Sequence, residues 1–196
     1  MLNSTIDGFS RALAYTYNHN GVLPNYISYN QSTYPITTNT TGNTTTNTTD
    51  PYLLPSHNCQ SNDAVIISLS KNLTKGCTSV LSKATNIFNY VRDYIKYDQY
   101  ENTRYGAVKT LSRKLGNCCD QAHLLVALLR AANIRAGYAH AECQFNSGIK
   151  GHVWAKIYLN NEWVDADPTS RYNSIGNTKS NTIISWRIKL TSEILF

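Results

Sequence analysis

The second half of this 196-residue chain carries residue types that can perform nucleophilic catalysis. Cys118 follows Gly116-Asn117, where a predicted loop turns into a predicted helix. A thiol at a helix N-terminus lies at the positive end of the helix dipole, which favours the thiolate form. Backbone N–H groups of the same turn can stabilise an oxyanion. A cysteine in this position is nevertheless more often structural, so a catalytic interpretation needs a partner base.

A predicted hairpin supplies the candidate base. Asn160-Asn161 separates two alternating segments and is typical of a two-residue type I′ turn, because asparagine tolerates positive φ. Such a turn pairs Leu159 with Glu162. The same register, continued along both strands, pairs His152 with Thr169.

This register places four functional side chains on one face of the hairpin, namely His152, Trp154, Asp165 and Asp167. Asp167 is the diagonal neighbour of His152, so the two backbones lie within ~7–8 Å of each other across the hairpin and the side chains can reach each other. A slip of one residue would put the two on opposite faces. With Cys118, the pair predicts thiol catalysis on a carbonyl, in which His152 moves the proton and Asp167 orients the imidazole.

The elements that must position these residues are helices followed by strands. The first helix is predicted from a cap at residues 61–63 to about residue 73, and two more helices are predicted at 82–95 and 118–132. The segment 96–113 is predicted to be a loop. Strands are predicted at 134–143, 152–159 and 162–167. This order indicates an α+β domain with an antiparallel sheet. The helix that Cys118 begins is apolar along most of its length, so we expect it to be the central buried helix.

Composition and charge exclude some classes of protein. Hydrophobic residues make up 41% of the chain and charged residues 15%, which suits a folded domain. The longest apolar run, residues 124–129, is far shorter than the ~20 residues of a membrane span. Residues 1–58 carry net charge −1 and the remainder +7, which suggests an acidic partner. No basic cluster with interleaved aromatics suggests nucleic acid.

The N-terminal part has a different character. Residues 37–50 hold nine Thr and three Asn, a composition that predicts a linker. Six Asn-x-Ser/Thr triplets, three of them in this linker, favour an extracellular protein. No secretory signal begins the chain, so we expect either processing from a longer precursor or export by another route.

The remaining cysteines and histidines allow two further interpretations. Cys59 and Cys77 flank the first predicted helix and would form a disulfide only if these flanks fold back on each other. Cys119 is expected to be a small buried hydrophobe that points away from Cys118. The alternative is a zinc site without a familiar spacing, made of Cys119, His123, His140 and Cys143.

Several segments together suggest a family: Gly-Asn-Cys-Cys-Asp-Gln-Ala-His-Leu at 116–124, Ala-Leu-Leu-Arg at 127–130, His-Val-Trp-Ala at 152–155, Trp-Val at 163–164 and Asp-Pro-Thr at 167–169. They resemble the transglutaminase-like superfamily. With residues 87–97 and 102–107, the resemblance covers about residues 56–196 and is greatest to the pseudomurein endoisopeptidases of methanogenic archaea and their viruses. It implies a papain-like α+β fold, with a central buried helix packed on an antiparallel sheet.

The resemblance also implies an activity. Cys118 would be the nucleophile, His152 the base and Asp167 the orienting carboxylate of a cysteine peptidase that hydrolyses an isopeptide bond in pseudomurein, through a thioacyl intermediate. We expect Trp154, Tyr105 and Asn102 to contact the substrate. Without the extra β-domains of tissue transglutaminases, hydrolysis is favoured over acyl transfer, which stays an alternative. A second alternative is a catalytically silent wall-binding or adhesin module.

The resemblance extends to domain organisation and partners. Residues 1–36, through Leu-Pro-Asn-Tyr-Ile at 23–27, resemble the end of a pseudomurein-binding repeat. The expected order is therefore this helical segment, a linker at 37–55 and a catalytic domain at 56–196. The chemistry requires no cofactor, although the family resemblance allows a calcium or magnesium ion. We expect the protein outside the cell or at the cell wall, or released at lysis if a virus encodes it.

Overall fold

The computed structural model describes residues 49–179 and 182–196. Four helices are described: α2 (Ala64–Thr74), α3 (Val80–Tyr94), α4 (Gly106–Arg113) and α5 (Cys118–Ala131). Strands β3 (Ala136–Phe145), β4 (Gly148–Leu159), β5 (Glu162–Ala166) and β6 (Thr182–Thr191) form one sheet, and the short strands β1 (Lys96–Tyr97) and β2 (Leu115–Gly116) form another. The predicted segment at 1–36 and most of the predicted linker lie outside the described residues.

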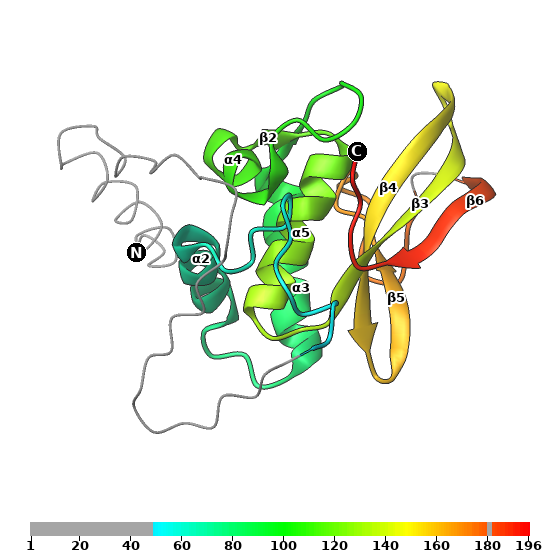
Figure 1. Ribbon diagram of the computed structural model, residues 1–196. Coiled ribbons are helices and arrows are strands. Elements are labelled where there is room, and N and C mark those ends of the chain that lie inside the picture. The colour runs from blue at the N-terminus through cyan, green and yellow to red at the C-terminus, as the bar shows by residue number, and fades with distance from the viewer. Residues whose placement is uncertain (1–48, 180–181) are drawn as a thin grey trace, which may run out of the picture. The chain divides into compact units, whose positions relative to one another are not determined.

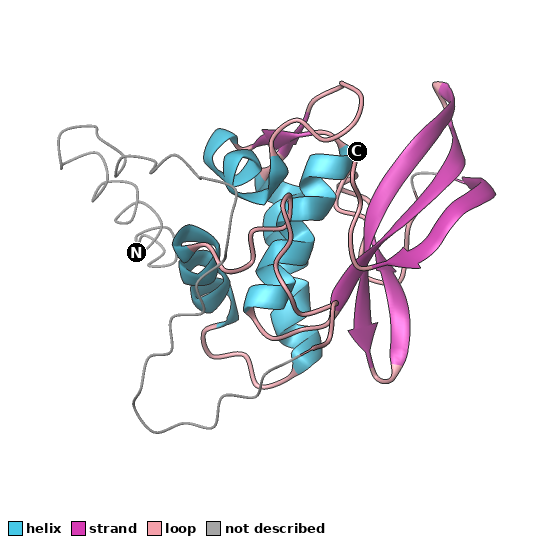
Figure 2. Cartoon of the chain, viewed as in Figure 1, coloured by secondary structure: helices cyan, strands magenta, loops and turns pink. Residues whose placement is uncertain are grey.

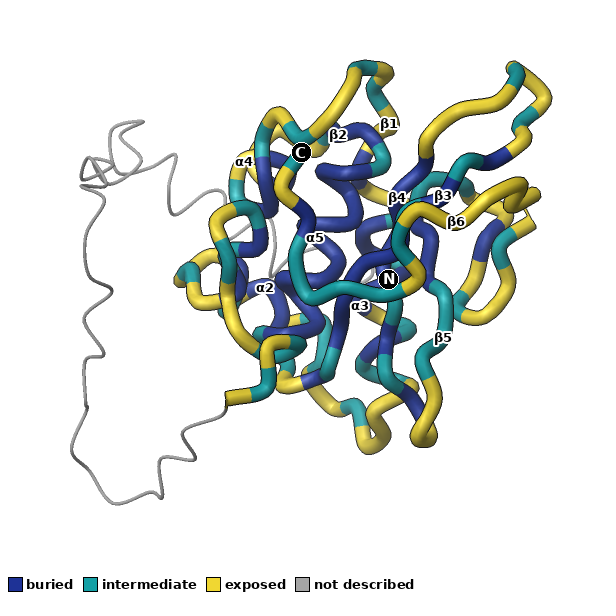
Figure 3. Tube along the Cα trace, turned by 45° about the vertical axis from the view of Figure 1, so that its right-hand side comes forward, coloured by how far each residue is buried: buried dark blue, intermediate teal, exposed yellow. Residues whose placement is uncertain are grey.

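The predicted fold class is confirmed. The larger sheet is antiparallel with strand order β5-β4-β3-β6, while β1 and β2 pair in parallel. Helix α5 lies between the other helices and this sheet (Figures 1 and 2). Nearly every residue of α5 after Cys118 is buried, which Figure 3 shows as a continuous dark-blue core. The central buried helix thus has the position that its apolar sequence predicts.

Local capping explains the first two described helices. Asp63 accepts a hydrogen bond from Val65 N at 2.8 Å and so begins α2 at residue 64. Gly76, just after this helix, has φ +78°, a conformation that favours glycine. Ser79 and Ser82 form a capping box, so α3 begins slightly before its predicted start at residue 82.

Helix α4 corrects the prediction that residues 96–113 form a loop. Its first N–H groups bind acceptors far away in the sequence. The Asp120 carboxylate accepts from Gly106 N at 2.8 Å, and Gln60 Oε1 accepts from Val108 N at 3.2 Å. Because the cap is supplied by tertiary structure, no local signal marks the start of this helix.

The hairpin register is confirmed near the turn. Leu159 pairs with Glu162, and Asn160 and Asn161 have φ of 50° and 67°, as a type I′ turn requires. The ladder ends at Ala155–Ala166, so the predicted pairing of His152 with Thr169 is wrong. Pro168 has no N–H to donate, and the chain turns away from β4 after Asp167.

Two segments at the edges of the domain differ from the sequence analysis. Strand β6 is absent from the sequence prediction. It lies at the edge of the sheet and most of its residues are exposed, so its sequence does not need the alternation of apolar and polar residues that marks a half-buried strand. Residues 50–54, assigned to the linker, pack on the domain. Tyr52 O accepts from Ala136 N at 3.1 Å, and the Tyr52 ring lies 4.7 Å from that of Trp163. The domain therefore begins before residue 56.

The cysteines within the described residues are all free thiols, so the Cys59–Cys77 disulfide is not formed. Cys59 is completely buried and contacts Tyr138, whereas the sulfur of Cys77 lies 3.2 Å from Asn86 Nδ2. The flanks of α2 do not fold back on each other as a bridge would require. Among the helices described, none has the length and apolarity needed to cross a membrane.

Candidate active site

The imidazole–carboxylate pair predicted from the hairpin is present. His152 Nε2 lies 2.9 Å from Asp167 Oδ2, and both residues are almost completely buried. The other carboxylate oxygen of Asp167 accepts from Thr169 N at 3.0 Å and from Thr169 Oγ1 at 2.7 Å. Asn173 Nδ2 also donates to the Asp167 backbone oxygen at 3.1 Å. The loop after β5 thus fixes the carboxylate under the imidazole.

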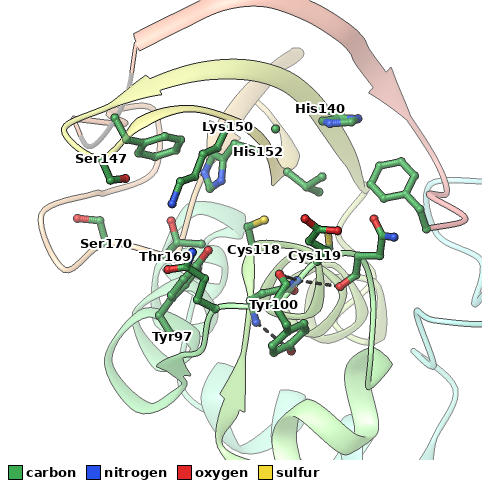
Figure 4. A pocket seen from close by; sticks show the side chains of 18 residues that line it. Tyr97, Tyr100, Cys118, Cys119, His140, Ser147, Lys150, His152, Thr169 and Ser170 are labelled. Carbon is green, nitrogen blue, oxygen red and sulfur yellow. Dashed lines mark hydrogen bonds between the residues drawn. The ribbon is translucent and has the colours of Figure 1, made fainter.

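The thiol reaches this pair from the first residue of α5. Asn117 caps the helix by accepting from Asp120 N at 3.0 Å, which sets the backbone direction at Cys118. Because Nε2 of His152 faces Asp167, Nδ1 is left for the sulfur. The Cys118 side chain lies beside the His152 ring, as Figure 4 shows, and its pKa responds to both His152 and Val153 N of β4. The packing of α5 on β4 therefore completes the three-residue arrangement.

Electrostatics favour a thiolate–imidazolium pair. A hydrogen bond from the Cys119 thiol, followed by hydrogen bonding and attraction from His152, holds the pKa of Cys118 well below its usual range. Burial opposes the charge on His152, but Asp167 and Cys118 outweigh it and raise the pKa of His152 to about 10. Burial likewise opposes the charge on Asp167, yet His152 and Thr169 lower its pKa. These shifts favour the thiolate form of Cys118.

Cys119 differs from its expected role. It is buried, as predicted, but it also lines the cavity beside Cys118, and hydrogen bonding between the two thiols lowers the pKa of Cys118. That hydrogen bond raises the pKa of Cys119 far above its usual value, so it stays protonated. The two neighbouring thiols therefore have pKa values shifted in opposite directions.

Cys118 and His152 open onto a cavity of about 890 Å³, whereas Asp167 lies behind the imidazole and does not line it. It is lined by Tyr97, Gln99, Tyr100, Glu101, Asn102, Asn117, Cys118, Cys119, His140, Phe145, Ser147, Lys150, Gly151, His152, Val153, Thr169, Ser170 and Phe196. Of the three predicted substrate contacts, Asn102 lies on the wall, whereas Trp154 and Tyr105 do not. The cavity is large enough to hold several residues of a peptide.

Trp154 supports the imidazole from behind. Its ring stacks on that of His152 with centroids 5.7 Å apart and an interplanar angle of 27°. Its Nε1 donates to Asp165 Oδ1 at 2.7 Å, and Lys156 Nζ lies 2.8 Å from the same oxygen. These contacts fix Trp154 in the core, so it positions His152 and does not touch the cavity.

Tyr105 instead belongs to a structural network around Asp120, which sequence reasoning missed. The fully buried Asp120 carboxylate accepts from Tyr100 Oη at 2.5 Å and from the backbone N–H groups of Arg104, Tyr105 and Gly106. Asn117 Nδ2 donates to the backbone oxygens of Tyr100 and Asn102 at 3.0 and 2.7 Å. The start of α5 therefore holds the loop that forms one cavity wall. An Asn immediately before the helix was the only sequence signal for this.

The zinc interpretation is wrong, because its members have other partners. Both ring nitrogens of His123 are engaged, one 3.0 Å from Tyr138 Oη and the other 2.9 Å from Thr103 Oγ1. His140 packs against the Phe196 ring at 5.0 Å. Within residues 49–179 and 182–196, no three His, Cys, Asp or Glu side chains gather in a metal-binding cluster.

Comparison with known proteins supports the fold. The family model of the transglutaminase-like superfamily matches residues 67–168. A candidate cysteine protease from Cytophaga hutchinsonii superposes with a TM-score of 0.59 and 25% identity, over 73% of this chain and 46% of that chain. Among curated proteins, no significant match is found.

Two other solved structures are more distant. One is a candidate protease from Parabacteroides distasonis, with TM-score 0.47, 14% identity and coverage of 65% of this chain and 27% of that chain. The other is the periplasmic domain of TgpA from Pseudomonas aeruginosa, with TM-score 0.48, 17% identity and coverage of 61% of this chain and 45% of that chain. The chain matches less than half the length of each of these three structures.

Proposed function

This chain belongs to the transglutaminase-like superfamily, and from that membership and the lowered pKa of its Cys118 thiol we propose that it is a cysteine peptidase that hydrolyses an isopeptide bond. The observation that carries the proposal is the contact of the Cys118 sulfur with an imidazole that is itself bound to Asp167 at 2.9 Å. We further propose that the substrate is a peptide cross-link of archaeal pseudomurein. This choice rests on the sequence resemblance and on the +7 charge of residues 59–196, which suits a carboxylate-bearing polymer.

The chemistry follows from the arrangement of the three side chains. The Cys118 thiolate attacks the carbonyl carbon of the amide, and the oxygen takes up the negative charge. Backbone N–H groups in the first turn of α5 have no acceptor inside the helix and stabilise this oxyanion. His152 then gives its Nδ1 proton to the leaving amine as the C–N bond breaks, which leaves a thioester on Cys118.

Hydrolysis of the thioester restores the enzyme. His152, now neutral, removes a proton from a water molecule, and the resulting hydroxide attacks the thioester carbon. The C–S bond breaks, the carboxylic acid product leaves and gives up its proton to solvent, and the thiolate–imidazolium pair is restored. Asp167 stays ionised throughout, and it keeps the imidazole in orientation and stabilises its charge.

The direct test of the proposed hydrolysis is to incubate the protein with isolated cell walls under reducing conditions. Purified protein incubated with pseudomurein sacculi should release new amino groups, and Cys118→Ala should abolish release while its circular dichroism spectrum stays unchanged. Undiminished release by Cys118→Ala would reject Cys118 as the nucleophile. Binding to sacculi without any release by the wild-type protein would instead support a silent wall-binding module.

The same reaction distinguishes hydrolysis from acyl transfer. With a labelled primary amine present, a hydrolase gives free carboxylate termini, whereas a cross-linking enzyme gives labelled amide adducts. We expect free termini to dominate, in keeping with the candidate cysteine protease among the similar structures. An N-terminal segment that anchors the enzyme to the wall, and a location outside the cell, are part of the proposal.

A further inference from the structure

We propose that Lys150, together with Ser147 and Ser170, forms a subsite that binds a free carboxylate of the substrate next to the scissile amide. The inference rests on the proposed function and names its substrate class, namely isopeptides that carry an unblocked carboxylate beside the cleaved bond. Neither the hydrolysis of amides in general nor the three reacting side chains requires such a subsite.

The strand register aims Lys150 at the cavity. Lys150 and His152 are two residues apart on β4, so their side chains leave the same face of the sheet. Two residues of strand correspond to a distance of about 6.5–7 Å between their Cα atoms. Both residues line the cavity that Cys118 opens onto. A group held by Lys150 would therefore lie within one amino-acid length of the reacting carbonyl.

Two hydroxyl groups lie at the same end of the cavity. Ser147 comes from the turn between β3 and β4, and Ser170 from the loop after β5; both line the cavity. Figure 4 shows these two side chains and Lys150 at the end that also holds Thr169. An ammonium group and hydroxyl groups are all hydrogen-bond donors that suit the oxygens of a carboxylate.

The polar side-chain groups of the proposed subsite donate no hydrogen bond within the described part of the protein. Among the described residues, Lys150 and Ser147 have no side-chain hydrogen bond or ion pair, and Ser170 Oγ only accepts, from Tyr172 N at 3.3 Å. Lys156, on the same strand, is by contrast paired with Asp165 at 2.8 Å. The charge of Lys150 is therefore available to a ligand.

The proximity of this charge to the nucleophile selects a type of amide. In a main-chain peptide bond, the carboxyl groups adjacent to the cleaved bond are themselves tied up in amides. An isopeptide formed through a side chain leaves the α-carboxyl group of that residue beside the bond, free to be ionised. The subsite thus favours isopeptides over internal peptide bonds, and among isopeptides those whose carboxylate is unblocked.

A matched substrate pair tests this preference. Two fluorogenic isopeptides that differ only in an α-carboxylate or an α-carboxamide are compared by kcat/KM. The wild-type protein should prefer the carboxylate by roughly 10-fold to 100-fold, the range for a charge-assisted hydrogen bond. Lys150→Gln should remove the preference by lowering kcat/KM for the carboxylate alone, and Lys150→Arg should retain most of it.

Two further variants separate a local contact from a change in total charge. Lys109→Gln removes an exposed cation that does not line the cavity, and Glu101→Gln removes an anion that does. Both should keep the carboxylate preference. A wild-type preference near one, or a Lys150→Gln variant that still prefers the carboxylate, would overturn the subsite while hydrolysis itself continued to support the proposed function.

A binding measurement tests the subsite independently of catalysis. In a Cys118→Ala background, calorimetry should show that the carboxylate peptide binds at least about 10-fold more tightly than the carboxamide. Adding Lys150→Gln should equalise the two affinities. Equal binding in the Cys118→Ala protein would reject the subsite. Absence of hydrolysis of either substrate by the wild-type protein would reject only the proposed function.

Discussion

At the scale of single residues, the site shifts the pKa values of two neighbouring cysteines in opposite directions. Hydrogen bonding with the Cys119 thiol, His152 and Val153 N lowers the pKa of Cys118, the proposed nucleophile. The thiol of Cys119 is held protonated by the same contact. Since a hydrogen bond to a charged acceptor is stronger than one between neutral groups, the donor role of Cys119 has a measurable consequence.

Replacing Cys119 should change the pH dependence of alkylation at Cys118. In the wild-type protein, iodoacetamide should react rapidly at pH 6, where a free thiol of pKa ~8.5 is almost wholly protonated. Cys119→Ala removes a hydrogen bond to the thiolate, so the midpoint should move up by about 1–2 pH units. Cys119→Ser retains an O–H donor and should move it less. An unchanged midpoint in Cys119→Ala would show that the contact does not stabilise the thiolate.

The upper limit of the pH profile is set by a different residue. Because the pKa of His152 is raised to about 10, the imidazolium that protonates the leaving amine persists to alkaline pH. Hydrolysis should therefore fall only as the pH approaches 10, whereas alkylation, which needs the thiolate alone, should not fall there. A hydrolysis rate that halves near pH 7 would contradict this assignment.

At the scale of elements, Asp120 connects the start of α5 to the start of α4. Its carboxylate accepts three backbone N–H groups from residues 104–106 and the Tyr100 hydroxyl. A side chain at Gly116 would be tightly confined, since a Cβ there would lie 3.0 Å from Asp120 Cβ and from Thr110 Cγ2. One buried carboxylate thus determines both a helix terminus and a wall of the cavity.

Asp120→Asn should loosen this loop without removing the reacting groups. An amide can accept at only one of its two heavy atoms and places N–H groups against N–H donors. Hydrogen exchange at residues 104–106 should accelerate, and KM should rise more than kcat falls. Asp98→Asn in the same loop is the control, because the Asp98 side chain makes no hydrogen bond within the described chain. Equal exchange rates in the wild type and Asp120→Asn would contradict the role of this carboxylate.

Elements that depend on neighbours in the sequence were predictable, and those that depend on distant residues were not. The Asn160-Asn161 turn encodes its own register, which places His152 and Asp167 on one face before any tertiary contact is known. The cap of α4 comes from Asp120, which follows it in the chain, so the helix was missed. Likewise, Cys118 approaches His152 because α5 packs on β4. The spacing of residues along the sequence does not reveal this packing.

At the scale of the whole domain, Arg130 of α5 joins segments from both ends of the described chain. Its guanidinium donates to Leu54 O at 2.5 Å, to Ser192 O at 2.6 Å and to Ala136 O at 2.9 and 3.1 Å. The residue is only 5% exposed. These carbonyls belong to the segment before α2, to the segment after β6 and to the first residue of β3. The helix that presents the nucleophile is therefore tied to the sheet on which it must pack.

Arg130→Met should destabilise the domain much more than a surface change of the same kind. It keeps most of the buried aliphatic volume but leaves the buried Ala136 carbonyl and the part-buried Leu54 and Ser192 carbonyls without this donor. A buried unsatisfied group costs about 1–3 kcal/mol, so the free energy of unfolding in urea should fall by about 2 kcal/mol or more, a large part of the stability of an ordinary domain. Arg187→Met, which breaks the exposed pair with Glu142, should shift the urea midpoint only slightly. If the two variants unfolded at the same urea concentration, the hydrogen bonds of Arg130 would not hold α5 against the sheet. Apolar packing alone would then have to maintain the geometry at Cys118.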